Sequence, residues 1–563
     1  EESMRRSVRI FIGLGFTLGL LFLLAIAIQG PATAAMIGSG PKAPTATTVI
    51  TVTTLVDEDD GGGHCAPASG EDCSLREAID HANANSTSAD PYEIHFAQGG
   101  IISVTQGYFY IPGDGVIING DRDADGNPDI EVRYISGNIP TNSGLFYLNA
   151  SDIHLQGLAV VGSTESGIFI TNYDDPDSLD IEGIEVANNW VGINLQGEIV
   201  SNTVYGIRVV KYPPGGSRSV NNILIQENVL SGNGDDGLYL QDVPSATHVL
   251  SNIIGLDPTG TVTSPNGGDG ISIIARGIPT TATTIRGNTI SGNARHGIFL
   301  DEAQGIMIAR NKIGTNITGT QGLGNGKDGI QVNDSDHNVI GGSDPASRNI
   351  IAGNARAGVF VSGADAQHNL IQNNYIGTGQ SGTEVVGNGE SGDSINDDGD
   401  GGVYIQDGAT YNDVRDNLIR FNYIGVRFSG GEPLPADPID PPQHNQVISN
   451  TITQNNKYGI TNKSTHRNTA PYTTPAAGDN LIQGNVITGT GQACGASDTW
   501  CTGIGIYNYG ASPQISNNRI EENEDYGISN SVHFWTDGAS NASDDLLSMP
   551  IKTAVFDLEI QRP

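Results

Sequence analysis

Four aspartates alternate with other residues in the segment "GDRDADGNPDIEV", and a glycine follows the third of them. They match the first nine positions of a D-x-D-x-D-G-x-x-D calcium-binding loop, in which alternate carboxylates converge on one cation. The twelfth position of a complete EF-hand loop should be a bidentate Glu, but it is Val132 here. We therefore expect a structural calcium site, with an Asp-rich surface turn as the alternative. Its predicted ligands are Asp121, Asp123, Asp125 and Asp129.

A second set of ionisable residues directly precedes a recurrent glycine in four successive repeats. If the repeats stack in register, these side chains form a row about 4.8 Å apart on one face. Like charges at such a spacing raise one another's pKa or bind a cation, and either property suits acid/base chemistry on a sugar. The alternative is a set of solvated turn residues. The candidate catalytic residues are Asp236, Asp269, His296 and Asp328.

The residue two positions after each recurrent glycine is predicted to point outward. Aromatic residues occupy four of these positions, and rows of exposed aromatic side chains are uncommon. Flat rings along a groove would suit stacking against sugar rings, whereas burial beneath long inserts is the alternative. The candidate carbohydrate-binding residues are Tyr239, Phe299, Phe360 and Tyr404. An acidic column five residues after the glycine would flank the same groove and consists of Asp242, Glu302, Asp334 and Asp407.

These residues are positioned by a repeated phrase that starts near Asn188. Examples are "NVLSGNGDDGLYL" from Asn228 and "NTISGNARHGIFL" from Asn288. Apolar residues alternate over short stretches, without a helical stripe, and self-similarity at this period indicates a solenoid of short strands. We therefore predict a parallel β-helix. The recurrent asparagines are expected to stack as a hydrogen-bonded ladder. Three histidines, His296, His337 and His368, do not share one repeat position, which gives little support for a multi-histidine metal site.

Composition narrows the possible partners. The 563-residue chain has a formal net charge of −36, which argues against nucleic acid or an anionic membrane surface. Its 76 glycines show no G-X-Y period, so they indicate tight turns rather than collagen.

The N-terminal residues predict export. A basic segment from Met4, an apolar run over residues 10–28 and the small residues "ATAA" form a signal peptide over residues 1–35, with Met4 as the expected start. Left uncleaved, the apolar run is long enough to span a bilayer. A linker is expected over residues 36–47. Export favours disulfides within the two close cysteine pairs, Cys65 with Cys73 and Cys494 with Cys501.

An N-terminal cap is predicted by "SLREAIDHANA". Ser74 and Glu77 form a capping box, and the apolar face that follows fits a helix over the open end of the solenoid. The residues "CSLREAID" from Cys73, behind "LVDEDDGGGHCAPASGEDC", resemble the N-terminal segment of the CSLREA-domain family. The repeats resemble the right-handed parallel β-helix proteins of the pectin-lyase-like superfamily. That superfamily includes lyases, glycosidases, epimerases and adhesins, so the resemblance implies a fold and not an activity.

The enzyme patterns of that superfamily are incomplete here. Pectate-lyase-like catalysis would need Asp-bound calcium and a cationic base, but Arg276, Arg295 and Lys327 lie in no matching pattern. The polygalacturonase set is represented only by "DD" at Asp235 and "HG" at His296, and the epimerase signature D-P-H-E is missing.

The sequence therefore predicts an all-β, right-handed parallel β-helix over residues 101–545, with a CSLREA-type cap and short helix over residues 48–100. Residues 546–563 are expected to be a closing strand or a truncated end. The predicted function is an extracellular or cell-surface monomer that binds polysaccharide or cell-envelope glycan along one sheet face, stabilised by calcium. A membrane is expected only through an uncleaved signal segment. The alternatives are a lyase or hydrolase of acidic glycans and a structural spacer or adhesin.

Overall fold

The computed structural model describes residues 48–59, 65, 72–173, 180–212, 219–242, 245–276, 280, 282–389, 401–430, 442–463, 478–491, 503–509, 512–524, 526–531, 547–549 and 553–555. All of them belong to one compact unit, Ala43–Pro563. The predicted signal peptide and linker, the pair Cys494 and Cys501, and most of residues 546–563 lie outside the described residues. No helix among the described residues is long and apolar enough to cross a membrane.

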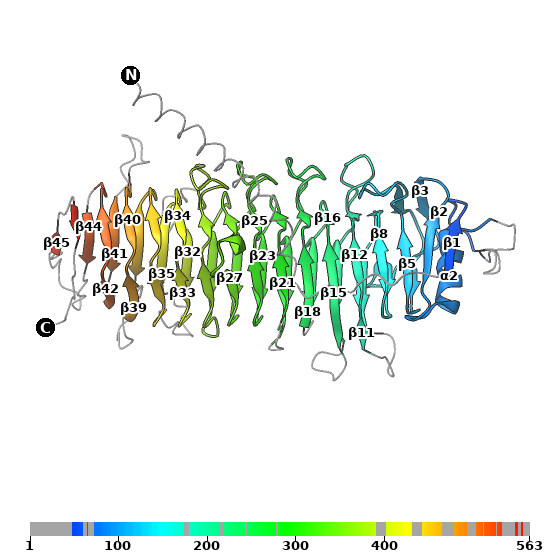
Figure 1. Cartoon of the computed structure of the whole chain (residues 1–563), viewed down its shortest axis with the longest axis horizontal. Coiled ribbons are helices and arrows are strands. Elements are labelled where there is room, and N and C mark those ends of the chain that lie inside the picture. Colours follow the sequence, from blue (N-terminus) through cyan, green and yellow to red (C-terminus); the bar gives the residue numbers. More distant parts are fainter. Residues whose placement is uncertain are drawn as a thin grey trace, which may run out of the picture. The chain divides into compact units, whose positions relative to one another are not determined.

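The described strands form three sheets of 16, 15 and 15 strands, and successive coils contribute one strand to each sheet (Figure 1). Sheet 1 consists of β1 (Thr48–Val52), β2 (Tyr92–Phe96), β5 (Val116–Asn119), β8 (His154–Gln156), β12 (Glu185–Ala187), β15 (Val220–Gln226), β18 (Ser245–Leu250), β21 (Thr284–Arg286), β24 (Met307–Ala309), β27 (Val339–Gly341), β30 (Leu370–Gln372), β33 (Asp413–Arg415), β36 (Gln446–Ile448), β39 (Gly478–Gln483) and β42 (Ser512–Ser516), with β11 (Ile181–Glu182) beside β15.

Sheet 2 consists of β4 (Phe109–Ile111), β7 (Gly144–Leu148), β10 (Ser166–Thr171), β14 (Ile207–Val210), β17 (Leu238–Gln241), β20 (Ile271–Ile274), β23 (Ile298–Asp301), β26 (Ile330–Asn333), β29 (Val359–Ser362), β32 (Gly401–Gln406), β35 (Ile424–Ser429), β38 (Tyr458–Lys463), β41 (Ile504–Tyr509), β44 (Tyr526–Ser531) and β45 (Leu547–Met549). Sheet 3 consists of β3 (Gly100–Val104), β6 (Ile130–Tyr134), β9 (Leu158–Val161), β13 (Trp190–Val191), β16 (Val229–Leu230), β19 (Ile253–Ile254), β22 (Thr289–Ile290), β25 (Lys312–Ile313), β28 (Ile350–Ile351), β31 (Tyr375–Ile376), β34 (Leu418–Arg420), β37 (Thr451–Thr453), β40 (Val486–Thr488), β43 (Arg519–Glu521) and β46 (Thr553–Val555).

Neighbouring strands are parallel within these sheets, which confirms the predicted parallel β-helix; the antiparallel exceptions are β45 on β44 and β46 on β43. The alternation in "GIFL" explains how each coil closes around a core. In β23, Ile298 and Leu300 are fully buried, whereas Phe299 between them lies on the outer face and is half-buried. One continuous apolar core runs from Ile50 to Ile520.

The recurrent glycine is required by close stacking and not by a left-handed backbone. A Cβ atom on Gly297 would lie 2.6 Å from the carbonyl oxygen of Gly329 in the next coil, closer than a carbon atom can approach. The glycine five residues earlier serves the turn instead, because Gly292 has φ 74°.

The recurrent asparagines form the predicted ladder. The buried Asn311 side chain donates from Nδ2 to Asn349 Oδ1 (3.1 Å) and to the Ile285 carbonyl (2.9 Å). Its Oδ1 accepts from the backbone and side-chain nitrogens of Asn288 at 2.9 and 3.0 Å. Each asparagine thus connects three coils and satisfies backbone groups that the turn leaves unpaired.

The N-terminal end of the stack is covered by α2 (Leu75–Asn85), which packs against β1, β2, β4 and β5. The predicted capping box is confirmed: the Glu77 amide donates to Ser74 Oγ at 3.2 Å, and the Ser74 amide donates to the Glu77 carboxylate at 2.9 Å. The predicted disulfide between Cys65 and Cys73 is also present.

Candidate functional site

The aspartate loop lies between β5 and β6, in the first coils of the stack. Carboxylate oxygens of Asp121, Asp123 and Asp129 lie within 4.8 Å of one another, a set that is able to hold a metal ion. Asp125 is outside this group and instead accepts the Asn127 amide at 2.8 Å. The structure therefore brings together three of the four predicted ligands.

The predicted acidic row is in register but closed to solvent. Asp236, Asp269, His296 and Asp328 are only 5, 1, 3 and 0% exposed, respectively. The Asp236 carboxylate accepts the backbone N–H of Asp269 at 2.6 Å, and the Asp269 carboxylate accepts that of His296 at 2.7 Å. The His296 ring lies between two carboxylates, with Nδ1 3.1 Å from Asp269 and Nε2 3.5 Å from Asp328. The row thus connects adjacent coils through side-chain to backbone hydrogen bonds.

Burial separates the pKa values of the first two members of the row. Desolvation, reinforced by the Asp269 charge, raises the pKa of Asp236 from 3.8 to about 7. Desolvation also opposes ionisation of Asp269, but the hydrogen bonds and charge of His296 outweigh it and lower the pKa of Asp269 below 3.8. Paired carboxyl groups with separated pKa values are typical of acid/base sites, yet a polymer cannot reach these buried groups in this conformation.

The acidic column five residues after the glycine lies at the ends of β17, β23, β26 and β32. All four members adopt a left-handed backbone, with φ between 41° and 55°. Asp242 is 1% exposed, whereas Glu302 is exposed and Asp334 is half-buried. The members are Asp242, Glu302, Asp334 and Asp407.

The four predicted aromatic residues share one column on the outer face of sheet 2, but their rings are covered to different degrees. Tyr239 and Phe299 are half-buried, whereas Phe360 and Tyr404 are 6 and 7% exposed. Phe360 and Tyr404 pack against each other with ring centroids 5.0 Å apart. Tyr239 stacks on Tyr205 at 4.6 Å. These packed rings offer a ligand much less surface than the sequence suggested.

Two of the described long inserts lie against sheet 3 rather than against this column. The insert glycines Gly319 and Gly382 approach Ile350 and Tyr375, which belong to sheet 3. The burial of Phe360 therefore comes at least partly from neighbouring side chains in its own column.

The same column continues toward the N-terminal coils as Tyr110, Tyr147, Phe169 and Arg208, each in register with the next. There the outer face of sheet 2 is hollowed into a pocket of about 510 Å³ over β7, β10, β14 and β17. We call it the sheet 2 pocket. Its lining comprises Tyr108, Pro140, Thr141, Asn142, Ser143, Tyr147, Phe169, Thr171, Tyr173, Arg208, Val210, Lys211, Tyr212, Gln241 and Arg276.

Two tyrosines on the pocket wall are open to solvent. Tyr173 and Tyr212 are 55 and 44% exposed and meet edge to face with ring centroids 4.5 Å apart. Tyr147 and Phe169 are nearly buried below them, with centroids 5.1 Å apart. The pocket therefore combines an aromatic floor with rings that a ligand can contact.

The sheet 2 pocket is also cationic, in a chain of net charge −36. It contains Arg208, Lys211 and Arg276. The ion pair seen there among the described residues joins Arg276 Nη1 to Asp242 Oδ2 at 3.7 Å. Lys211 is 6% exposed, and the Arg208 guanidinium lies 5.2 Å from the Phe169 ring centroid. Among the described residues that line the pocket, three side chains are cationic and none is a carboxylate, a balance that favours an anionic ligand.

Three buried polar atoms of the pocket wall have no hydrogen-bond partner among the described residues. They are Ser143 Oγ, Thr171 Oγ1 and Arg208 Nε. Buried polar atoms are nearly always paired with protein, water or ligand. Because these atoms are almost fully covered, an ordered water or a shift of the pocket wall is needed to pair them.

Sequence reasoning missed this pocket because the repeat phrase becomes regular only after it. "GIFI" at Gly167 and "GIRV" at Gly206 place Phe169 and Arg208 two residues after a glycine, and this signal would have extended the column. In the preceding coil the glycine is displaced, since Gly144 pairs with Ser166 rather than with Gly167.

The family model described as "Right handed beta helix region" matches residues 215–394 and 314–472. The chain is a right-handed parallel β-helix. None of the curated protein sequences matches this chain.

Among solved structures, the A-module of the mannuronan C-5 epimerase AlgE6 of Azotobacter vinelandii is 15% identical, with a TM-score of 0.43, over 78% of this chain and 94% of that chain. The catalytic unit of a GH87 α-1,3-glucanase of Streptomyces thermodiastaticus is 14% identical, with a TM-score of 0.44, over 84% and 69%. The Dettilon tailspike protein is 12% identical, with a TM-score of 0.34, over 79% and 66%. At this level of similarity, the activities named for those proteins do not extend to this chain.

Proposed function

We propose that this β-helix is an exported protein that binds an anionic polysaccharide on the outer face of sheet 2. The observation that carries the proposal is the sheet 2 pocket, which combines solvent-facing tyrosines with three cationic side chains. Ligand sites are typically concave and apolar, with a few convergent polar groups that fix orientation.

The arrangement favours an acidic sugar over a small apolar ligand. Tyr173 and Tyr212 present rings at the surface, where a sugar ring can stack. The half-buried Arg208 lines the same pocket and is available to a carboxylate or sulfate group of the polymer, and the nearly buried Lys211 adds positive charge to the pocket wall. The outer face of sheet 2 continues on both sides of the pocket, which leaves an extended chain room to cross neighbouring coils.

The remaining features fit an extracellular location. The Cys65–Cys73 disulfide is typical of an oxidising compartment, and we propose that residues 48–100 act as a CSLREA-type cap. We further propose that Asp121, Asp123 and Asp129 hold a structural calcium ion. The protein would act as a monomer at or outside the cell surface.

A carbohydrate-active enzyme is the second candidate, and its support is the separation of pKa values between Asp236 and Asp269. Burial of the whole acidic row argues against it, because catalytic carboxyls must contact the substrate. A structural spacer or adhesin would leave the sheet 2 pocket without a ligand.

A panel of neutral, carboxylated and sulfated polysaccharides tests these candidates. We expect retention of acidic members, with loss of binding in Tyr173→Ala and Tyr212→Ala. Tyr411→Ala is the matched control, because Tyr411 is 50% exposed but lies near β33 of sheet 1. Release of unsaturated or reducing-end sugars, abolished by Asp269→Ala, would establish the enzyme instead. Failure of every acidic glycan to bind would refute the binding proposal.

A further inference from the structure

Four ring-bearing residues follow one another along the edge of sheet 1, each directly before a ladder asparagine. They lie at the turns leading into β27, β30, β33 and β36, and each has φ between 55° and 58°. This left-handed turn directs the following asparagine into the ladder. We call the set the ring ladder; its members are His337, His368, Tyr411 and His444. The sequence analysis correctly noted that the three histidines share no single repeat position. It overlooked that two of them, His337 and His368, do share one.

The rings of the ladder are nearly parallel except at the His337 end, where the last pair is tilted. His368, Tyr411 and His444 are stacked nearly parallel, with interplanar angles of 14° and 16° and centroid separations of 5.3 and 5.0 Å. His337 and His368 are also 5.0 Å apart, but their planes are tilted by 37°. The His337 side chain is 57% exposed. Because stacking covers the ring faces, the ring nitrogens are the groups that an incoming ligand can meet.

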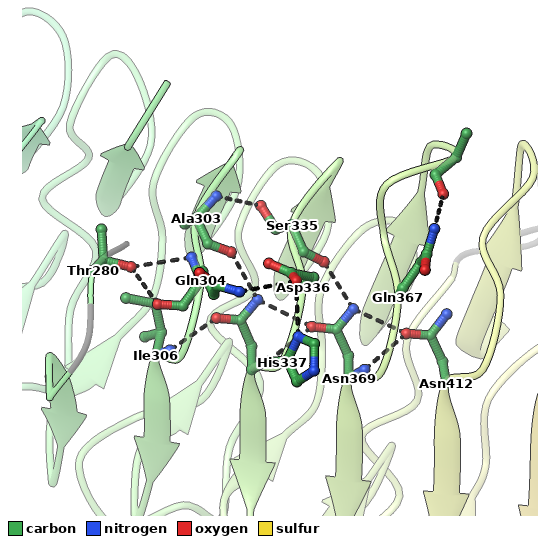
Figure 2. A network of polar contacts seen from close by, with 12 residues as sticks. Thr280, Ala303, Gln304, Ile306, Ser335, Asp336, His337, Gln367, Asn369 and Asn412 are labelled. Atoms are coloured by element: carbon green, nitrogen blue, oxygen red, sulfur yellow. Dashed lines mark hydrogen bonds and ion pairs between the residues drawn. The ribbon is translucent and has the colours of Figure 1, made fainter. Parts of the chain in front are cut away.

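A carboxylate fixes the orientation of the first imidazole. Asp336 Oδ2 lies 2.7 Å from His337 Nδ1 and accepts a second hydrogen bond from Gln304 Nε2 at 3.0 Å (Figure 2). With Nδ1 engaged by the carboxylate, Nε2 is the nitrogen left for another partner. A histidine whose second nitrogen is held by a carboxylate is typical of metal sites. Within the described residues, neither nitrogen of His368 has a hydrogen-bond partner.

We propose that His337 and His368 bind one divalent transition-metal ion, with Asp336 as a positioning residue. An ion about 2.1 Å from each ring nitrogen would lie roughly 3.2 Å from each ring centroid. When both rings turn so that one nitrogen of each points at the ion, centroids 5.0 Å apart give an angle at the metal of roughly 100°, close to tetrahedral. Water or exposed oxygen ligands would complete the coordination. Imidazole suits Zn²⁺, Ni²⁺ and Cu²⁺ rather than Ca²⁺, so the site is chemically distinct from the Asp121 loop.

Metal titration of untagged full-length protein, first freed of metal with EDTA, tests the proposal. Isothermal titration with Zn²⁺ and Ni²⁺ should reveal a site that His337→Ala and His368→Ala each weaken at least tenfold. His444→Ala is the matched control and should stay within twofold, because its ring neighbour is Tyr411 and not a second histidine. Asp336→Asn should weaken binding roughly tenfold or more if the carboxylate positions His337.

The variants are needed to assign the bound metal to this pair, because His64, His466 and His533 lie outside the described residues and are further potential ligands. Affinity at the pair should also fall on acidification, since protons compete with the metal for imidazole. Unfolding curves verify that each variant keeps the wild-type fold. The proposal is overturned if folded His337→Ala and His368→Ala proteins bind Zn²⁺ and Ni²⁺ as wild type does, or if the wild type binds neither ion.

Discussion

Neutralising Asp236 should stabilise the protein at alkaline pH and have a much smaller effect in mild acid. The Asp236 carboxyl is 5% exposed and lies beside Asp269 and Asp235, so its ionised form is poorly solvated and repelled. In Asp236→Asn the side-chain oxygen can still accept the Asp269 amide, now 2.6 Å away. The substitution therefore removes the charge while keeping the contact between coils.

The size of the effect follows from the pKa of Asp236, which is raised from 3.8 to about 7. Because the folded state holds this proton more tightly, the resulting stability is complete below the unfolded pKa and is lost as pH rises through about 7. A difference of about three pKa units corresponds to at most about 4 kcal/mol. For the roughly 410 residues that the structure describes, the unfolding entropy is about 0.9 kcal/mol/K, so the limit in melting temperature is about 5 °C.

Thermal unfolding followed by circular dichroism at pH 5 and pH 8 measures the difference in melting temperature between Asp236→Asn and wild type. Asp236→Asn should melt about 5 °C above wild type at pH 8 but only about 2 °C above it at pH 5, where the unfolded wild type is already ionised. Glu302→Gln, an exposed carboxyl at the end of β23, should match wild type at both values. If Asp236→Asn is less stable than wild type at pH 8, the assigned electrostatics of the acidic row are wrong.

Two further outcomes follow from the stacked coils. Asn311→Ala leaves the backbone N–H of Asn288 without its acceptor and should lower the free energy of unfolding by about 3 kcal/mol. Asn85→Ala, at an exposed position, should cost under about 0.5 kcal/mol in the same unfolding assay. Equal effects of the two substitutions would refute the importance of the ladder. Adding Ca²⁺ to EDTA-treated protein should raise the melting temperature of wild type and of Asp125→Asn but not of Asp121→Asn; an unchanged wild type would count against the calcium loop.

The repeat phrase was sufficient to predict the β-helix, because each coil uses the same local devices. The nine-residue step from Asn228 to Gly237 spans β16 and its flanking turns, in which the asparagine satisfies backbone groups and the glycine permits close stacking. The capping box at Ser74 and Glu77 was equally legible, since its hydrogen bonds are local.

The candidate site was only partly predictable, because register does not determine exposure. The alignment of the repeats placed Asp269 beside His296 correctly. Their burial, and the hydrogen bond from the His296 backbone N–H to the Asp269 carboxylate, depend on how the coils stack in three dimensions. Phe360 and Tyr404 likewise share the predicted column yet cover each other. The sheet 2 pocket was missed because Tyr173 and Tyr212 reach it from beyond the strand ends, where no repeat period marks them.

The most direct test of the central claim is the affinity of the sheet 2 pocket for an acidic polysaccharide, measured by isothermal titration at two salt concentrations. Arg208→Gln and Lys211→Gln should each weaken binding at least tenfold and reduce its dependence on salt. Arg519→Gln, an exposed arginine on β43 of sheet 3, should bind within twofold of wild type. Equal affinities for wild type and both pocket variants would contradict the proposed binding site.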